Sequence, residues 1–127
     1  MAIDFGSRKV GIALSDANRE FAFPHTVVKR EDALEAIQKI ANAHEVAAIV
    51  FGESKDLSGK DNPIQKSITS FAEAVEKKTE LPVYFEPEHF TSKEASRETG
   101  ENDMIDASAA AVLLRSFIEK KRYEETQ

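Results

Sequence analysis

The spacing of hydrophobic and polar residues along the chain predicts five strands. Short apolar or β-branched runs, bounded by polar residues, glycine or proline, cover residues 2–4, 10–15, 21–28, 46–51 and 81–85. The polar, glycine-led segment 6–9 has the composition of a hairpin turn between the first two runs. Pro24 inside the third run indicates an edge strand or a local irregularity, because proline cannot donate to a sheet. The unbroken apolar run 46–51 is typical of a buried central strand.

Apolar residues spaced three and four apart predict helices between and after these strands. The first helix covers residues 32–43, and the second starts at Pro63, which suits the first turn of a helix. A capping box formed by Thr91 and Glu94 opens a short third helix, which Gly100 ends. The last helix covers residues 103–121, and we expect four of its residues to face the core: Ile105, Ala109, Val112 and Phe117.

The order of these elements predicts the fold class. Three strands come before the first helix, so they pair as antiparallel neighbours, whereas the later strands alternate with helices and join the sheet by crossovers. We therefore expect an α/β fold, with a mixed sheet of about five strands, the first three antiparallel, and helices on both faces. A single domain over residues 1–127 accounts for the pattern, and an RNase H-like arrangement has this order of elements.

Composition narrows the chemistry. The chain has 127 residues, of which 41% are hydrophobic, enough for one core. It has no cysteine, which excludes thiolate zinc sites, thiol nucleophiles and redox-active thiols. No stretch approaches the roughly 20 apolar residues of a membrane span, so we expect no membrane partner and a cytoplasmic protein. Its 17 basic and 23 acidic side chains give a net charge of −6, which argues against binding nucleic acid through bulk charge.

Carboxylates at the ends of predicted strands are the first candidate functional residues. Asp4 interrupts an apolar strand just before Gly6, and it is either a buried ligand or a turn residue bonded to nearby amides. Glu86 and Glu88 follow the last strand. Either one of them reaches the sheet position of Asp4, or both are solvated loop acids.

Two further acids open the last predicted helix. Asp103 and Asp106 share a helix face, and both could simply offset the helix dipole, with Asp103 as the N-cap. The small residues at 107–111 would let this helix lie close to a sheet and bring Asp106 toward the strand ends. Convergence of three or four of these carboxylates would suit Mg²⁺ or Mn²⁺, because hard cations prefer oxygen ligands. Two such metals can clamp the attacking and leaving oxygens of a phosphodiester.

Four sequence blocks resemble the YqgF-type family. Residues 1–16, with the sequence MAIDFGSRKVGIALSD, resemble its opening motif. Three later blocks follow in the family's order: AIVFG at 48–52 with Gly59 in the next loop, the segment 81–92, and IDASAAAVLL at 105–114. Members of this family are described as Holliday junction resolvase-like proteins and pre-16S rRNA nucleases with an RNase H-like fold. The resemblance covers nearly the whole chain and implies a nuclease.

The resemblance also assigns the catalytic, metal-binding acids, for Mg²⁺ or Mn²⁺, to three positions: Asp4, Glu88 and Asp106. Two neighbours of the middle acid depart from the family pattern, since Pro87 stands where the family has an acid and His89 where it has an arginine. Glu86 is therefore an alternative to Glu88. Asp103 is either a fourth metal ligand or a helix cap.

Basic residues near the first turn are the candidate substrate contacts. Arg8 and Lys9 would hold a substrate phosphate beside the metals or be solvated turn charges, and Lys55 would lie on the rim of the groove. Because neighbouring strand residues face opposite ways, we expect only one of Arg8 and Lys9 to point into the groove. We favour Arg8, whose planar guanidinium can bind phosphate bidentately. The other basic groups are expected to be solubilising surface or helix ends: Lys29–Arg30, Lys77–Lys78 and residues 120–122.

Three functions compete on these observations. The first is a metal-dependent nuclease that hydrolyses phosphodiester bonds, either at the 5′ end of precursor 16S rRNA, which the resemblance favours, or in a DNA Holliday junction. Its partners would be structured RNA, branched DNA or ribosomal precursor particles. The second is a catalytically impaired RNase H-like binding module in ribosome assembly or transcription, which Pro87 and the acidic segment 97–103 favour. The third, a fragment of an actin-like ATPase, is disfavoured because such enzymes need two domains of this kind.

Overall fold

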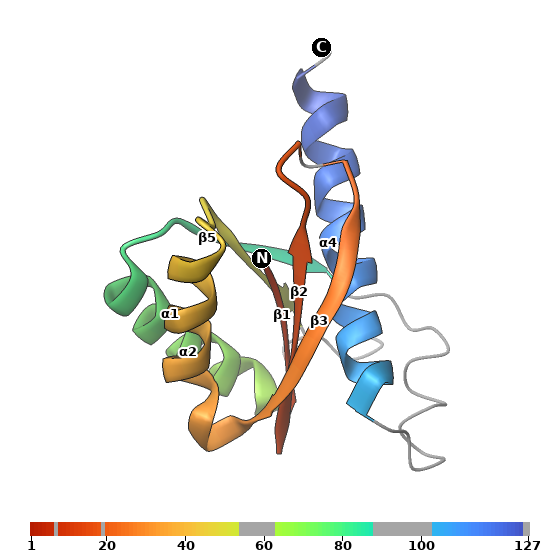
Figure 1. The fold of residues 1–127 in the computed structure, drawn as a ribbon. Helices are drawn as coiled ribbons and strands as arrows, with labels where there is room; N and C mark the ends of the chain where they lie inside the picture. The colour runs from red at the N-terminus through yellow and green to blue at the C-terminus, as the bar shows by residue number, and fades with distance from the viewer. Residues whose placement is uncertain (7, 19, 54–62, 88–102, 126–127) are drawn as a thin grey trace.

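A computed structural model describes residues 1–6, 8–18, 20–53, 63–87 and 103–125, and Figure 1 shows the ribbon. Five strands form one sheet, and helices pack on both of its faces. The predicted third helix, 91–100, lies outside the described residues. In chain order the elements are β1 (Ala2–Phe5), β2 (Lys9–Ser15), β3 (Ala22–Lys29), η1 (Arg30–Asp32), α1 (Ala33–Ala43), β4 (Ile49–Glu53), α2 (Pro63–Thr79), β5 (Val83–Pro87) and α4 (Asp103–Glu125).

The sheet has the order β3-β2-β1-β4-β5, so β1 is its central strand. β1, β2 and β3 pair antiparallel, whereas β4 and β5 join parallel to β1, which confirms the predicted mixed sheet. Both interpretations of Pro24 are correct. β3 is an edge strand, and its register with β2 shifts between the pairs Ile12–Thr26 and Ala13–Pro24. No helix among the described residues is long and apolar enough to cross a membrane.

Residues of β1 alternate between two hydrophobic cores. Ile3 and Phe5 belong to the larger core, which α1 and α2 cover, and Ala2 belongs to a smaller core under α4. Figure 1 shows α1 and α2 on one side of the sheet and α4 on the other. Because successive strand side chains face opposite ways, Asp4 shares the α4 face with Ala2.

The inward face of α4 differs from the predicted one. Val112 is 69% exposed, and the buried residues are Ala107, Ala110, Leu113, Leu114 and Ile118. Each helical residue advances about 100° around the axis, so Val112 lies nearly opposite the buried Ala110. The prediction for Val112 is therefore wrong. It assumed that the larger apolar residue faces the core, whereas the small alanines do so and allow close packing.

The first helix ends at Ala43, as predicted, but β4 starts at Ile49 rather than at residue 46. Glu45 has a φ of 51°, in the left-handed region, and the amide of Val46 donates to the carbonyl of Ala41 at 3.0 Å. Glu80 follows α2 with a φ of 59°. Glycine is the usual residue at such positions because a Cβ atom is strained there.

Replacing either Glu45 or Glu80 by Gly is expected to raise the free energy of unfolding by about 0.5–1 kcal/mol, since relief of left-handed strain outweighs the added freedom of the unfolded chain. Urea denaturation measures the change. Glu35→Gly is the control, because Glu35 lies inside α1, where glycine should cost about 1 kcal/mol. Equal destabilisation at all three positions would contradict the expectation.

The amino group of Met1 is buried beside β4, where it donates to the carbonyl of Ala48 at 3.1 Å. Burial lowers the pKa of this amino group from 8.0 to about 6. In a chain that begins with this free amino group, the unfolded state binds the proton more tightly than the folded state does. This group therefore does not reduce the free energy of unfolding above pH 8. As the pH falls from 8 to 6, the free energy of unfolding decreases by about 2–3 kcal/mol. The ¹³C shift of the Met1 Cα, followed against pH, should give a midpoint near 6, and a midpoint near 8 would contradict the burial argument.

Candidate functional site

Asp4 is the buried carboxylate at the centre of the sheet. Asp4 is only 3% exposed. It lies in β1, on the face of the sheet that α4 covers. The alternation that places Ile3 and Phe5 in the opposite core fixes this direction. The structure shows that Asp4 is buried, and its assignment as a metal ligand rather than as an acid bonded to nearby amides stays a prediction.

Glycines flank Asp4 on both neighbouring strands. Asp4 pairs with Gly11 of β2. On the other side, β1 pairs with β4 at Ala2 with Val50 and Ile3 with Phe51, and one further step in this register would bring Gly52 beside Asp4. Neither of these two glycines has a side chain that could cover the carboxylate. Ala107 and Ala110 of α4 are fully buried and hold the first half of that helix close to the sheet.

The other predicted metal ligands are only partly covered by the structure. Asp103 and Asp106 lie in the first turn of α4, but their side chains are outside the described part, as is all of Glu88. Within the described residues, no three His, Cys, Asp or Glu side chains gather into a group that could hold a metal. The assignment of Asp103, Asp106 and Glu88 as ligands therefore stays a prediction.

Glu86, the alternative middle ligand, is bound to the second half of α4. Its carboxylate is 3% exposed, and Lys120 Nζ lies 3.0 Å from each of its two oxygens. The hydroxyl of Ser116 donates to its Oε2 at 3.1 Å. Ser116 is ten residues beyond Asp106, or about 15 Å along a helix. Glu86 thus anchors β5 to α4, and Lys120 is a structural partner rather than solubilising surface.

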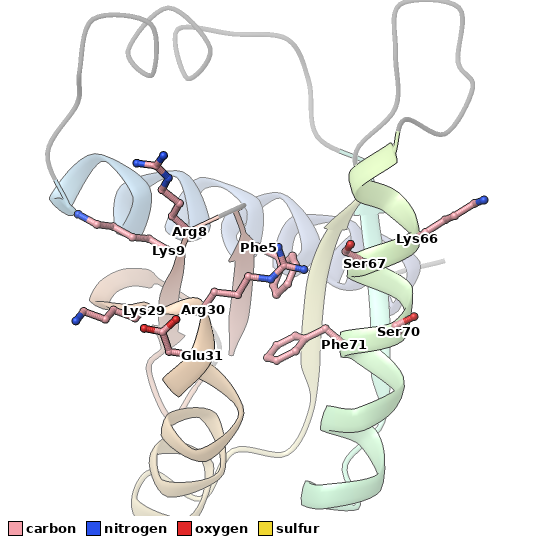
Figure 2. Close-up of a pocket in the computed structure, with 10 residues that line it drawn as sticks. All are labelled: Phe5, Arg8, Lys9, Lys29, Arg30, Glu31, Lys66, Ser67, Ser70 and Phe71. Carbon is pink, nitrogen blue, oxygen red and sulfur yellow. The ribbon is translucent and has the colours of Figure 1, made fainter.

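A basic hollow of about 1000 Å³ opens at the C-terminal end of β1, on the side of α1 and α2. Figure 2 shows it between the first hairpin, the start of η1 and the first half of α2. We call it the basic hollow; it is lined by Phe5, Arg8, Lys9, Lys29, Arg30, Glu31, Lys66, Ser67, Ser70 and Phe71. Lys55, the third predicted substrate contact, lies outside the described residues.

Arg8 and Lys9 both line this hollow, and which of them contacts a substrate phosphate stays a prediction. β2 begins at Lys9, and Arg8 lies in the preceding bend, where strand alternation does not apply. The turn depends on Gly6, whose amide donates to the carbonyl of Lys9 at 3.0 Å. A Cβ atom on Gly6 would lie 2.7 Å from that carbonyl oxygen, so a side chain would force the turn apart.

Three cations of the hollow were missed by sequence reasoning. Lys29 pairs with Lys9 across β2 and β3, and the amide of Arg30 donates to the carbonyl of Arg8 at 2.9 Å. The sequence could have indicated the position of Lys29 and Arg30, because antiparallel pairing brings the end of the third strand beside the start of the second. No comparable signal places Lys66, which reaches the hollow from α2.

Comparisons with known proteins identify the family. A sequence model of the RuvX family, described as Holliday junction resolvase, matches residues 1–120. Relatives from Rickettsia canadensis (strain McKiel), Maridesulfovibrio salexigens and Koribacter versatilis each carry the name "Putative pre-16S rRNA nuclease" and are each 32% identical to this chain. The matches cover 97%, 93% and 95% of this chain and 88%, 96% and 86% of those relatives. The chain therefore belongs to the RuvX family, which confirms the resemblance of its sequence blocks to Holliday junction resolvase-like proteins.

Proposed function

We propose that this protein is a divalent-metal-dependent nuclease that cleaves precursor 16S rRNA. One observation carries the proposal: a carboxylate, that of Asp4, is buried on the central strand with a glycine at its level on each side. Burying a charged carboxylate is costly unless a cation or hydrogen-bond donors compensate it. The names of the relatives support precursor 16S rRNA as the substrate, and the protein would then meet it in the cytoplasm, in ribosomal precursor particles.

The chemistry of the acids fits Mg²⁺ or Mn²⁺. Asp4 would hold the metal together with Glu88 and Asp106, and Asp103 would be a fourth ligand. When bound, the metal would supply positive charge against the charge that develops on the phosphate oxygens. The chain itself contributes the placement: β1 fixes Asp4, and the buried alanines of α4 bring the first turn of that helix to the same face. Arg8 and Lys9 would hold the substrate backbone at the end of β1.

A cleavage assay tests the proposal. The substrate is an RNA that spans the mature 5′ end of 16S rRNA, incubated with the protein and Mg²⁺, Mn²⁺ or EDTA. Cleavage is expected with either metal and none with EDTA. A four-way DNA junction of the same length is the second substrate, because the family description names a Holliday junction resolvase. Cleavage of the junction but not of the RNA would mean that the substrate is branched DNA. Binding of RNA without cleavage would favour the impaired binding module.

Arg8→Ala is expected to weaken RNA binding by about 3- to 10-fold for every sequence alike, because phosphate contacts carry no base information. The dependence of log K on log salt should become shallower by about 1. Metal affinity, measured by calorimetry, should stay nearly unchanged. Arg115→Ala is the control: it removes the same charge from an exposed arginine on α4, which is paired with Glu119 at 3.4 Å. If Arg8→Ala instead binds RNA normally and loses metal, the first hairpin supports the carboxylates and the substrate groove lies elsewhere.

A further inference from the structure

The basic hollow concentrates positive charge in an acidic protein. Five cationic side chains and one acid line it, whereas the whole chain has a net charge of −6. Its volume of about 1000 Å³ is at the upper end of the range for ligand sites. We propose that the basic hollow binds a single-stranded segment of the RNA substrate, with phosphates on its rim and an unpaired base on its floor. This inference rests on the proposed nuclease function.

The rim is built to face a polyanion. Lys9 and Lys29 lie directly opposite each other on neighbouring strands, an arrangement that costs stability because like charges repel. The backbone bond from Arg30 to Arg8 brings two arginines to the same corner. Lys66 of α2 is the fifth cation of the lining, and Figure 2 shows its side chain extending outward from the opposite wall. Phosphate groups of a bound strand would offset this repulsion, because successive phosphates can each interact with one of the cations along a groove.

The floor of the hollow contains planar groups. The Arg30 guanidinium lies over the Phe5 ring, 4.6 Å from its centroid, and the Phe5 and Phe71 rings are 4.8 Å apart. Figure 2 shows Arg30 and Phe71 reaching toward each other from opposite walls. Guanidinium planes and aromatic rings stack on unpaired bases, whereas the bases of a duplex are stacked on one another. This combination selects a single strand over a duplex.

The position of the hollow connects it to Asp4. Phe5 lines the floor and directly follows Asp4 in β1, although their side chains face opposite sides of the sheet. Adjacent Cα atoms are about 3.8 Å apart, so Asp4 and the hollow belong to the same end of β1, on its two faces. The bound segment would therefore adjoin the cleavage point, and the double-stranded part of the substrate would lie beyond it.

Binding without cleavage separates this inference from the proposed function. The protein carries Asp4→Asn, the buffer contains EDTA, and fluorescence anisotropy reports binding of a labelled single-stranded RNA of about 12 nucleotides. A duplex RNA of equal length is the competing probe. We expect the single strand to bind at least about 10-fold more tightly, because only its bases can stack on the floor. If the strand binds but the unsubstituted protein cleaves no RNA, the nuclease proposal fails and this one stands.

Two lysines of α2 give a matched pair of variants. Lys66 lines the hollow, whereas Lys78 lies near the other end of the same helix, about 18 Å away along its axis. Lys66→Gln should weaken binding of the single strand several-fold and make its salt dependence shallower by about 0.7, the slope for one phosphate of a single strand. Lys78→Gln should leave both unchanged. Equal effects of the two substitutions would mean that charge acts from a distance and would overturn the site.

The floor is tested by substitutions that keep charge or apolar volume. Arg30→Lys retains the cation but loses the plane, and Phe71→Leu retains an apolar side chain but loses the ring. Each should weaken binding of the single strand by about 10-fold and leave binding of the duplex unchanged. If the Phe71→Leu variant does not fold, the result for Arg30→Lys alone decides the test. Unchanged single-strand binding would overturn the proposal, as would displacement of the strand by an equal concentration of adenosine monophosphate, which would assign the hollow to a free nucleotide.

Discussion

Replacement of Asp4 by Asn should reduce the rate of RNA cleavage by on the order of 10²–10³-fold or more, because it removes the charge that is proposed to hold a metal at the reacting phosphate. The free energy of unfolding should stay the same or rise. Asp4 is 3% exposed, so the folded protein bears the cost of burying a charge there, and an amide of the same shape avoids it. Initial rates of cleavage and urea denaturation measure the two effects.

Asp16 is the control for this substitution because its role is structural and lies elsewhere. Its Oδ1 accepts hydrogen bonds from the amides of Glu20 at 2.7 Å and Phe21 at 2.9 Å. The bond from Phe21 is the main reason that the pKa of the Asp16 carboxyl lies below its ordinary value. Asp16→Asn should therefore lower stability and leave cleavage unchanged, the reverse of Asp4→Asn. A clear loss of stability in Asp4→Asn would instead make Asp4 a structural acid.

The largest effect on stability is expected from Lys120→Met. The substitution leaves the buried carboxylate of Glu86 with Ser116 as its remaining side-chain donor among the described contacts. Breaking a buried pair from one side costs several kcal/mol, but the Lys120 side chain is 58% exposed, so water can approach. We expect a loss of about 1–3 kcal/mol in the free energy of unfolding, measured in urea.

Two further variants show where this loss originates. Glu86→Gln leaves Lys120 in contact with solvent, so it should cost less than Lys120→Met. The double variant Glu86→Leu with Lys120→Met should recover most of the stability, because it removes the buried charge together with its partner. A double variant that is less stable than Lys120→Met alone would show that the carboxylate supports the fold in another way. Cleavage by all three should persist if Glu88 is the metal ligand.

The sheet could be predicted from the sequence because its strands are signalled locally. Gly6 marks the first turn, Pro24 marks an edge strand with a register shift, and Pro63 marks the start of α2. The order of strands and helices then limits the topology to few arrangements. Asp4 could be singled out for the same reason, since an acid inside an apolar strand needs a physical explanation.

The remaining parts of the site depend on contacts between distant segments. Glu86 meets Lys120 across 34 residues of sequence, and periodicity carries no information about such a pair. Lys66 is an ordinary exposed lysine in the sequence, and only the fold places α2 across the hollow from the first hairpin. Charge alone predicts that Lys29 and Arg30 are surface residues, and only the strand pairing brings them to Lys9 and Arg8.

The separation of β1 from α4 in the chain has a consequence for biosynthesis. β1 leaves the ribosome first, whereas the helix that covers its Asp4 face begins about 100 residues later. At 5–20 residues per second, the interval is roughly 5–20 seconds. During that time Ala2, Ala13 and Val50 lack their cover, and the acids of α4 do not yet exist. Because the proposed metal site includes an acid of α4, the nascent chain could not assemble that site before the last helix docks.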